Sequence, residues 1–171
     1  MRKIPFAATS IAGAISLALV SGAATAQITL KLHHLLSAKA PAHTKMLVPW
    51  ANDVEKAAGG KVKIQIYPAM SLGGKPPELI NQVRDGVVDI VWTVNGYTAG
   101  LFPRSEVFEL PFVHTNSATA TNLAMRDMFN NGAIAEEYKS VKVMFLHVHA
   151  GQGIQMAEKN VRTPDDLKGL K

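Results

Sequence analysis

VKIQIYPAMSLGGKPPELINQVRDGVVDIVW, residues 62–92, is the part of the chain with the clearest structural pattern. Apolar and polar residues alternate over Lys61–Tyr67, which predicts a strand with one face towards the core. Apolar residues at helical spacing then predict a short helix over residues 77–84. Val88–Trp92 is almost continuously apolar, as is typical of a strand covered on both faces. A strand, a helix and a second strand in this order predict an α/β domain with a largely parallel sheet.

Similar elements are predicted on both sides of this segment. Residues 28–33 alternate like a strand, and residues 43–58 carry apolar side chains at helical spacing. Pro49 lies inside that helix and is expected to kink it, because proline removes one backbone hydrogen bond. Further along, the same reasoning predicts a helix, two strands and a helical turn, over residues 117–129, 141–148, 153–157 and 163–166.

The composition excludes several classes of protein. The chain has 171 residues, of which 47% are hydrophobic and 18% charged, so it can bury enough apolar surface to fold. It contains no cysteine. A disulfide framework, a cysteine-ligated zinc or iron–sulfur centre and a thiol nucleophile are therefore excluded.

The first 26 residues are predicted to be an export signal. Arg2 and Lys3 precede the apolar segment Ile11–Val20, and small residues follow as far as Ala26. We expect signal peptidase to cut between Ala26 and Gln27 and the protein to be periplasmic. The alternative, an uncleaved membrane anchor, is disfavoured because the strongly apolar part is about ten residues long, whereas a spanning helix needs ~20.

The charge balance argues against nucleic acid as a partner. The chain has 18 basic and 13 acidic residues, a net charge of +5. Removal of residues 1–26 takes away two basic residues, which leaves 16 basic against 13 acidic and a net charge of +3. Nucleic-acid binding is usually accompanied by a clustered basic patch, and after residue 26 no run of basic residues is longer than two.

A candidate ligand loop follows the strand predicted at Val88–Trp92. In α/β sheets, ligands bind beyond the carboxyl ends of the strands. Trp92, Asn95 and Tyr97 lie there and offer both a flat apolar wall and hydrogen bonds. The alternative for Trp92 and Tyr97 is that both rings pack under the loop.

The sequence contains no convincing catalytic set. His147 and His149 are two apart on a predicted strand, and His33 and His34 end another strand, but such pairs from distant segments lack the spacing of a zinc site. We interpret them as histidines at strand ends that line a polar cleft. The loop at Gly73-Gly74 lacks the hydroxyl of a phosphate-binding loop and is interpreted as a turn. The chain has no GxSxG motif, and its one close carboxylate pair, Glu106 and Glu109, is expected to meet solvent or a basic partner such as Arg104.

Three blocks of sequence resemble one family. They are YPAMSLGGKPPELINQVRDGVVDIVW at residues 67–92, FPRSEVFELPFV at 102–113 and RTPDDLKGLK at 162–171. Together, in this order and spacing, they resemble the solute-binding proteins of tripartite ATP-independent periplasmic (TRAP) transporters, of the DctP type. The resemblance covers essentially the whole chain after residue 26.

The resemblance implies a type II periplasmic-binding-protein-like fold with two lobes, and no enzyme activity or cofactor. An organic acid would be held between the lobes and delivered to a membrane permease driven by an ion gradient, by a protein expected to be monomeric. Residues 27–149 would form the first lobe, and residues 150–171 the crossover and the start of the second. The cleft would be lined by His33 and His34, by the loop that carries Trp92, Asn95 and Tyr97, and by the crossover at His149 and Gln152.

The resemblance also implies an incomplete protein. The family's carboxylate-binding arginine would be the second residue after Lys171, so we expect a C-terminally truncated chain that by itself binds carboxylates poorly. Two alternatives are a secreted metal enzyme using His147, His149 and one of His33 or His34, and a periplasmic sensor domain of the same fold. The ligand stays open: Trp92 and Tyr97 suit an aromatic or branched acid, but a dicarboxylate, a sugar acid or a keto acid is compatible with the sequence.

Overall fold

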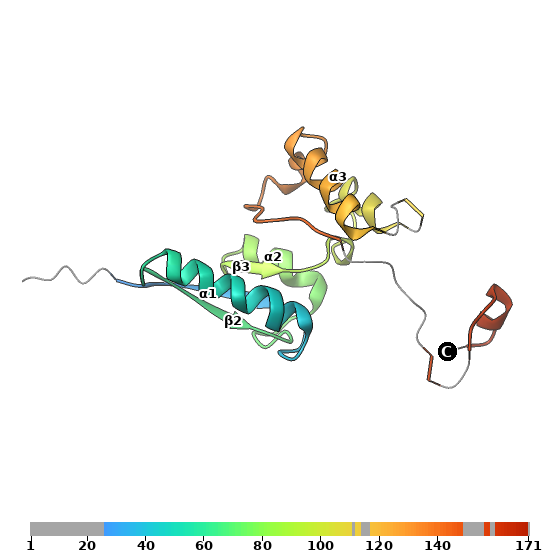
Figure 1. The fold of residues 1–171 in the computed structure, drawn as a ribbon, viewed down its shortest axis with the longest axis horizontal. Helices are drawn as coiled ribbons and strands as arrows, with labels where there is room; N and C mark the ends of the chain where they lie inside the picture. Colours follow the sequence, from blue (N-terminus) through green and yellow to red (C-terminus); the bar gives the residue numbers. More distant parts are fainter. Residues whose placement is uncertain (1–25, 111, 114–116, 149–155, 158–159, 171) are drawn as a thin grey trace, which may run out of the picture.

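A three-stranded parallel sheet forms one half of the molecule (Figure 1). The computed structural model describes residues 26–110, 112–113, 117–148, 156–157 and 160–170. Strands β1 (Ile28–His34), β2 (Val62–Tyr67) and β3 (Ile90–Trp92) are arranged in the order β2-β1-β3, and both pairings are parallel. This confirms the α/β class and all three strands of the N-terminal part, although β3 begins two residues later than the apolar run.

The central strand β1 holds the core of this half. Its register places Leu32 opposite Ile66 of β2 and Ile90 of β3. Leu32 is completely buried, whereas Ile28 at the start of the strand is 59% exposed. The C-terminal end of β1 is therefore buried, whereas its N-terminal end is exposed. The candidate site lies at the buried end.

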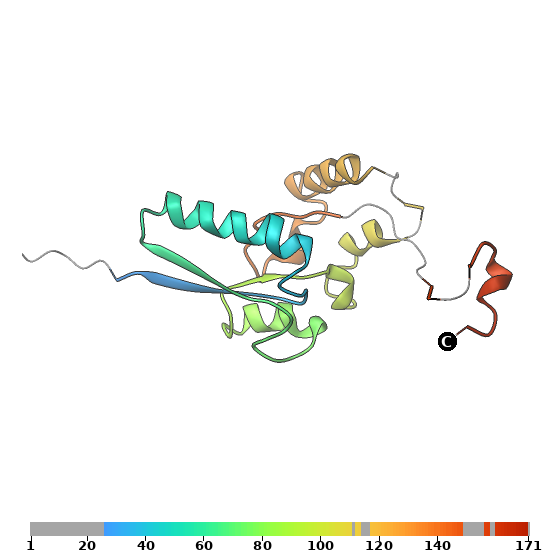
Figure 2. The same cartoon turned by 60° about the horizontal axis from the view of Figure 1, so that its bottom comes forward.

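Helices cover both faces of the sheet. Figure 2 shows α1 (Val48–Ala57) on one side and α2 (Leu79–Arg84) on the other. The predicted helix over residues 43–58 is interrupted, because His43–Leu47 form a wider π-helical turn before α1. Pro49 in the first turn of α1 has no N–H to donate one turn back and its ring would meet that carbonyl, so the turn before it opens.

The other half is built around a second apolar cluster. Helix α3 (Ala118–Asn130) begins at Ser117, whose side chain accepts a hydrogen bond from the Ala120 N–H at 3.2 Å, as expected of an N-cap. Short 3-10 turns over Asn95–Tyr97, Ser105–Glu109 and Ala135–Tyr138 pack nearby. The buried residues of this cluster are Ile80, Phe102, Phe108, Met125, Ile134 and Tyr138.

The predicted strand over residues 141–148 is wrong. Residues 142–148 run in an irregular path and pair with no strand in the described part of the chain. Their apolar side chains still pack, since Val143, Leu146 and Val148 contact the cluster around Phe102. The Val148 N–H donates to Asn122 Oδ1 at 2.5 Å. Alternation predicted burial correctly, but a strand also needs a neighbour with free backbone groups.

Near the C-terminus, the turn predicted at Thr163 is present. Residues Pro164–Leu167 form a 3-10 turn, and Asp166 Oδ2 accepts hydrogen bonds from the Thr163 N–H and hydroxyl, each at 2.9 Å. The predicted strand over 153–157 and the export signal lie almost entirely outside the described residues. In the part of the chain that the structure describes, no helix is long and apolar enough to cross a membrane.

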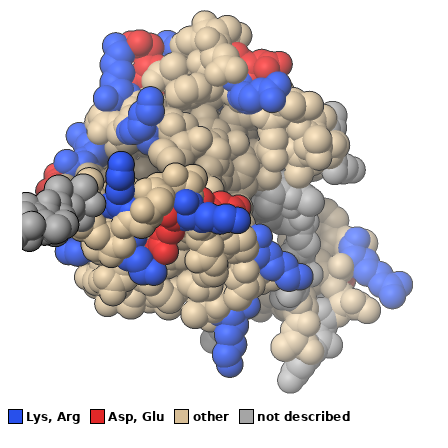
Figure 3. All heavy atoms as spheres, turned by 60° about the vertical axis from the view of Figure 1, so that its left-hand side comes forward, with Lys and Arg blue, Asp and Glu red and all other residues tan. Residues whose placement is uncertain are grey.

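The surface carries its charges in a dispersed pattern. On the face in Figure 3, Lys and Arg side chains are scattered and Asp and Glu side chains lie among them. The basic excess therefore forms no single patch on this face.

Candidate ligand-binding site

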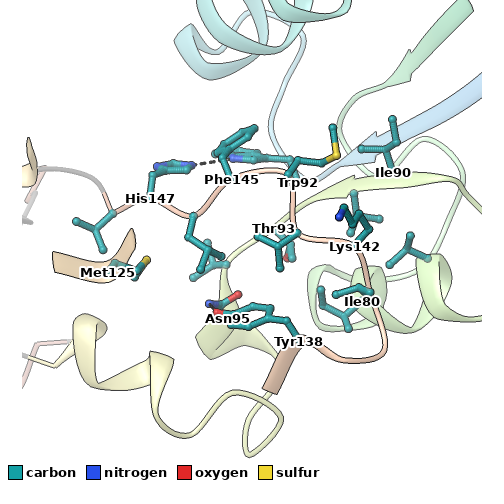
Figure 4. A pocket seen from close by; sticks show the side chains of 18 of the residues that line it. Ile80, Ile90, Trp92, Thr93, Asn95, Met125, Tyr138, Lys142, Phe145 and His147 are labelled. Carbon is teal, nitrogen blue, oxygen red and sulfur yellow. Dashed lines mark hydrogen bonds between the residues drawn. The ribbon is translucent and has the colours of Figure 1, made fainter. Parts of the chain in front are cut away.

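A cavity of about 710 Å³ opens beyond the carboxyl end of β3. It lies between the two apolar clusters, and its lining comes from α1, α2, β3, the loop after β3 and residues 140–148 (Figure 4). Both tryptophans of the chain, Trp50 and Trp92, line it. The volume falls within the range typical of small-molecule sites, and the position is where open α/β sheets bind their ligands.

Trp92 and His147 form one wall of the cavity. Trp92 Nε1–H donates to His147 Nε2 at 2.9 Å, and the two ring planes lie within 6° of each other with centroids 5.9 Å apart. Figure 4 shows the rings side by side, joined by this hydrogen bond, with Phe145 next to them. The indole N–H can only donate, so Nε2 of His147 is the acceptor of this hydrogen bond. The result is a flat aromatic surface suited to a planar ligand.

Polar groups come from the opposite wall. Asn95 Nδ2 donates to the Tyr138 hydroxyl at 2.6 Å, and Tyr138 donates to Ser105 Oγ at 2.8 Å. Burial raises the pKa of Tyr138, so its hydroxyl stays protonated at neutral pH. Thr93 Oγ1 is buried and has no hydrogen-bond partner among the described residues.

His33 and His34 lie outside the lining of this cavity. Both are completely buried at the end of β1. His33 Nδ1 is 2.7 Å from Gln82 Oε1, and His34 Nε2 is 2.9 Å from Nδ1 of His43 in the π-helical turn. Burial, together with the neighbouring His43 and His33, lowers the pKa of His34 to about 4. In this structure the two histidines are packed at the C-terminal end of β1, and the His34 ring lies next to Trp92 of β3.

The remaining predicted residues divide into two groups. Trp92 and Asn95 line the cavity, whereas Tyr97 is 45% exposed and is not among the lining residues. His149 and Gln152 lie outside the described residues. Trp92 both lines the cavity and packs against the core cluster that contains Leu32 and Leu47.

The two carboxylates of the loop were expected to meet solvent or a basic partner. Glu109 is exposed to solvent, and both carboxylates also accept hydrogen bonds from backbone N–H groups of the loop. Glu109 Oε1 accepts from the Gly96 N–H at 2.9 Å, and Glu106 Oε1 accepts from the Gly100 N–H at 3.3 Å. Arg104 is not their partner, because its guanidinium donates to the Ala133 carbonyl. The two glutamates hold the loop after β3 in shape, and Glu109 also lines the cavity.

Several site residues were missed by sequence reasoning. Thr93 follows the predicted strand directly, so its position was a usable signal. Tyr138 and Lys142 gave no such signal in the sequence, because they reach the cavity only through the folding of distant segments. His147 was expected, as a strand-end histidine, to line a polar cleft; in the structure it lines the cavity and accepts a hydrogen bond from Trp92. Among the described residues, no three His, Asp or Glu side chains are grouped so that they could hold a metal ion.

Comparison with known proteins identifies the family. The profile described as bacterial extracellular solute-binding protein, family 7 (DctP) matches residues 32–171. The chain belongs to this family. The DctP resemblance of the three sequence blocks is thereby confirmed, and with it the type II periplasmic-binding-protein-like fold, which the solved relatives share.

Solved relatives of this DctP-family chain include proteins that bind aromatic acids. A TRAP solute-binding protein from a marine metagenome, specific for aromatic acid ligands and bound to 3-hydroxybenzoate, is 45% identical with a TM-score of 0.78, over 84% of this chain and 44% of that one. A TRAP solute-binding protein from Rhodoferax ferrireducens T118, with copurified benzoate, is 42% identical with the same TM-score and the same coverage.

Curated relatives extend the comparison to other solutes. A Comamonas testosteroni protein named outer membrane transporter protein TsaT is 31% identical over 84% of this chain and 42% of its own length. The 2,3-diketo-L-gulonate-binding periplasmic protein YiaO of Escherichia coli K12 is 27% identical over 70% of this chain and 37% of its own length. The chain thus spans less than half the length of each of these relatives.

Proposed function

We propose that this chain forms the first lobe of a TRAP solute-binding protein that captures an aromatic carboxylic acid. The cavity beyond β3, walled by Trp92 and His147, carries the proposal. Support comes from the relatives at 42% and 45% identity, whose bound ligands are benzoate and 3-hydroxybenzoate. In this chain, a planar ring would lie against the Trp92–His147 surface while Leu47 and Trp50 exclude water from the other side.

The lobe organisation follows the same proposal. Residues 27–149 make the first lobe, and residues 150–171 lead into a second lobe that closes over the ligand. Closure shifts a population between open and closed states, so the affinity depends on contacts that both lobes make together. His33, His34, Tyr97, His149 and Gln152 stay candidates for contacts made in that closed state.

Export and delivery complete the proposed role. The signal of residues 1–26 would place the protein in the periplasm, and the loaded form would dock on TRAP permease subunits. N-terminal sequencing of the exported protein checks the first step. A mature chain that begins at Gln27 is expected, and retention of Met1 would contradict it.

A secreted metal enzyme is less well supported by the described contacts. His147 Nε2 already accepts from Trp92, and His34 is paired with His43. The family members found by comparison are solute-binding proteins. Zinc bound stoichiometrically to the purified protein, and lost together with a hydrolytic activity on chelation, would favour the enzyme.

The test uses a protein with both lobes. The term "two-lobe protein" means this chain followed by a second lobe. The second lobe comes either from its own gene or, by fusion after Lys171, from the Rhodoferax ferrireducens relative. A thermal-shift panel would contain benzoate, 3-hydroxybenzoate, succinate and glucuronate. A ligand at 100 times its Kd stabilises a protein by ~2.7 kcal/mol, so the aromatic acids should raise the Tm by several degrees. A shift with succinate or glucuronate alone would contradict the proposed substrate class.

A further inference from the structure

The polar wall of the cavity is the end of a directed chain of hydrogen bonds. Glu137 Oε1 accepts from the Arg104 N–H at 2.6 Å, and Glu137 Oε2 accepts from the Ser105 N–H at 3.0 Å. The Ser105 hydroxyl lies 2.8 Å from the same Oε2. A carboxylate only accepts hydrogen bonds, so the Ser105 proton must point to Glu137.

The direction of the Ser105 hydrogen bond determines the direction of the next hydrogen bonds, as far as Asn95. With its proton on Glu137, Ser105 Oγ accepts from the Tyr138 hydroxyl. Tyr138 has then used its proton and can only accept from Asn95, which it does at 2.6 Å. The Asn95 amide is therefore held with Nδ2 towards Tyr138 and with its carbonyl oxygen, Oδ1, turned away from it. Ser105 and Tyr138 are 1% and 5% exposed, so water does not compete within this chain.

Other groups near Asn95 favour a hydrogen-bond donor on the ligand. The Glu109 carboxylate lines the cavity and holds the neighbouring Gly96 N–H, and its negative charge disfavours a ligand carboxylate in the same corner. Thr93 lines the cavity, and its buried hydroxyl has no hydrogen-bond partner among the described residues. The basic side chain in the lining, Lys142, comes from a different segment (Figure 4).

We propose that this corner recognises a hydroxyl group, so that the ligand is a hydroxylated aromatic acid whose hydroxyl donates to Asn95 Oδ1 and exchanges a hydrogen bond with Thr93. The carboxylate of the ligand then lies at the other end of the ring, away from Glu109. Tyr138, Ser105 and Glu137 are positioning residues that fix the polarity of Asn95. This inference rests on the proposed function and adds which substituent of the ligand, a hydroxyl group, the first lobe recognises.

The experiment measures a preference between ligands. Calorimetric titration of the two-lobe protein should give a Kd for 3-hydroxybenzoate that is about five- to tenfold lower than for benzoate, the effect of one added hydrogen bond. 3-Methoxybenzoate, which keeps the oxygen but has no proton to donate, should lose that advantage.

Variants separate recognition from folding. Thr93→Val and Tyr138→Phe should each reduce the preference to about twofold or less, because each removes a hydroxyl on which recognition of the ligand hydroxyl depends. Tyr67→Phe is the matched control, since it removes a tyrosine hydroxyl in β2, outside the cavity lining, and should leave the preference unchanged. The thermal midpoint of each variant reports whether it is folded.

The outcomes distinguish the two proposals. Equal affinity for benzoate and 3-hydroxybenzoate, or a preference that survives both Thr93→Val and Tyr138→Phe, would overturn the hydroxyl inference and leave the aromatic-acid site intact. Binding of neither acid by a folded two-lobe protein would overturn the proposed function itself.

Discussion

At the scale of single residues, the end of the sheet next to the site contains a buried histidine with a lowered pKa. His34 is completely buried beside His43, and its pKa of about 4 lies well below the ordinary value of 6.5. The folded protein therefore holds the neutral imidazole, whereas the unfolded chain takes up a proton near pH 6.5. His34 stabilises the fold fully above that pH, and the contribution is lost as the pH falls from about 6.5 to about 4.

This gives a prediction on pH and stability. His34→Asn, which cannot be protonated, should flatten the pH dependence of the free energy of unfolding between pH 6.5 and 4. The wild type should lose on the order of 2–3 kcal/mol more than the variant across this window. Urea unfolding followed by circular dichroism at four pH values would measure it. Parallel curves for the two proteins would show that His34 titrates normally.

Single residues also show which parts of the candidate site could be predicted from the sequence alone. Trp92 and Asn95 were found because the loop after a parallel strand is a general ligand position. The family resemblance placed His33 and His34 in the cleft; in this structure both rings are buried, next to Gln82 and His43. Tyr138 could not be found, since its contact with Asn95 joins residues 43 positions apart.

At the scale of elements, the stability of the sheet is concentrated at the C-terminal end of β1. Leu32→Ala should destabilise the protein by about 3 kcal/mol, because Leu32 is completely buried between β2 and β3 and its loss leaves a cavity. Ile28→Ala is the matched control in the same strand and should cost less than ~1 kcal/mol, since Ile28 is 59% exposed. Chemical denaturation gives both values, and equal losses would contradict the assignment of the core.

The segment over residues 142–148 makes a second prediction at this scale. It is held by packed side chains and by the hydrogen bond from Val148 to Asn122, without a strand ladder in the described part of the chain. Amides of residues 142–147 should therefore exchange with deuterium much faster than those of β1. Addition of 3-hydroxybenzoate to the two-lobe protein should slow their exchange, because this segment carries His147. Protection equal to that of β1 without ligand would point to strand pairing.

The secondary-structure elements also show what the sequence pattern could not predict. Alternation over β1 and β2 predicted strands that formed because each has a parallel neighbour, as the register of Leu30 with Ile64 illustrates. The strand predicted over residues 141–148 did not form, because neighbour and register are properties of the whole sheet and cannot be determined from the segment alone. The opened turn before Pro49 was predictable as a break, though not as a π-helical turn.

At the scale of the whole molecule, the proposed function includes a second lobe. The chain spans less than half the length of its solved relatives. Large apolar side chains near the cavity are open to solvent, including Met144 and Phe145 at 60% and 45% exposure. A second lobe would cover such surface and supply a cation for the carboxylate, so residues 27–171 alone should bind aromatic acids at least 100-fold more weakly than the two-lobe protein.

Calorimetric titration of 3-hydroxybenzoate into the two-lobe protein and its Trp92→Leu variant tests the central claim most directly. We predict micromolar or tighter binding by the two-lobe protein. We also predict a loss of more than about tenfold in Trp92→Leu, because the substitution removes the flat surface that Trp92 shares with His147. Undiminished affinity in a folded Trp92→Leu variant, or no binding by a folded two-lobe protein, would contradict the assignment of this cavity as the ligand site.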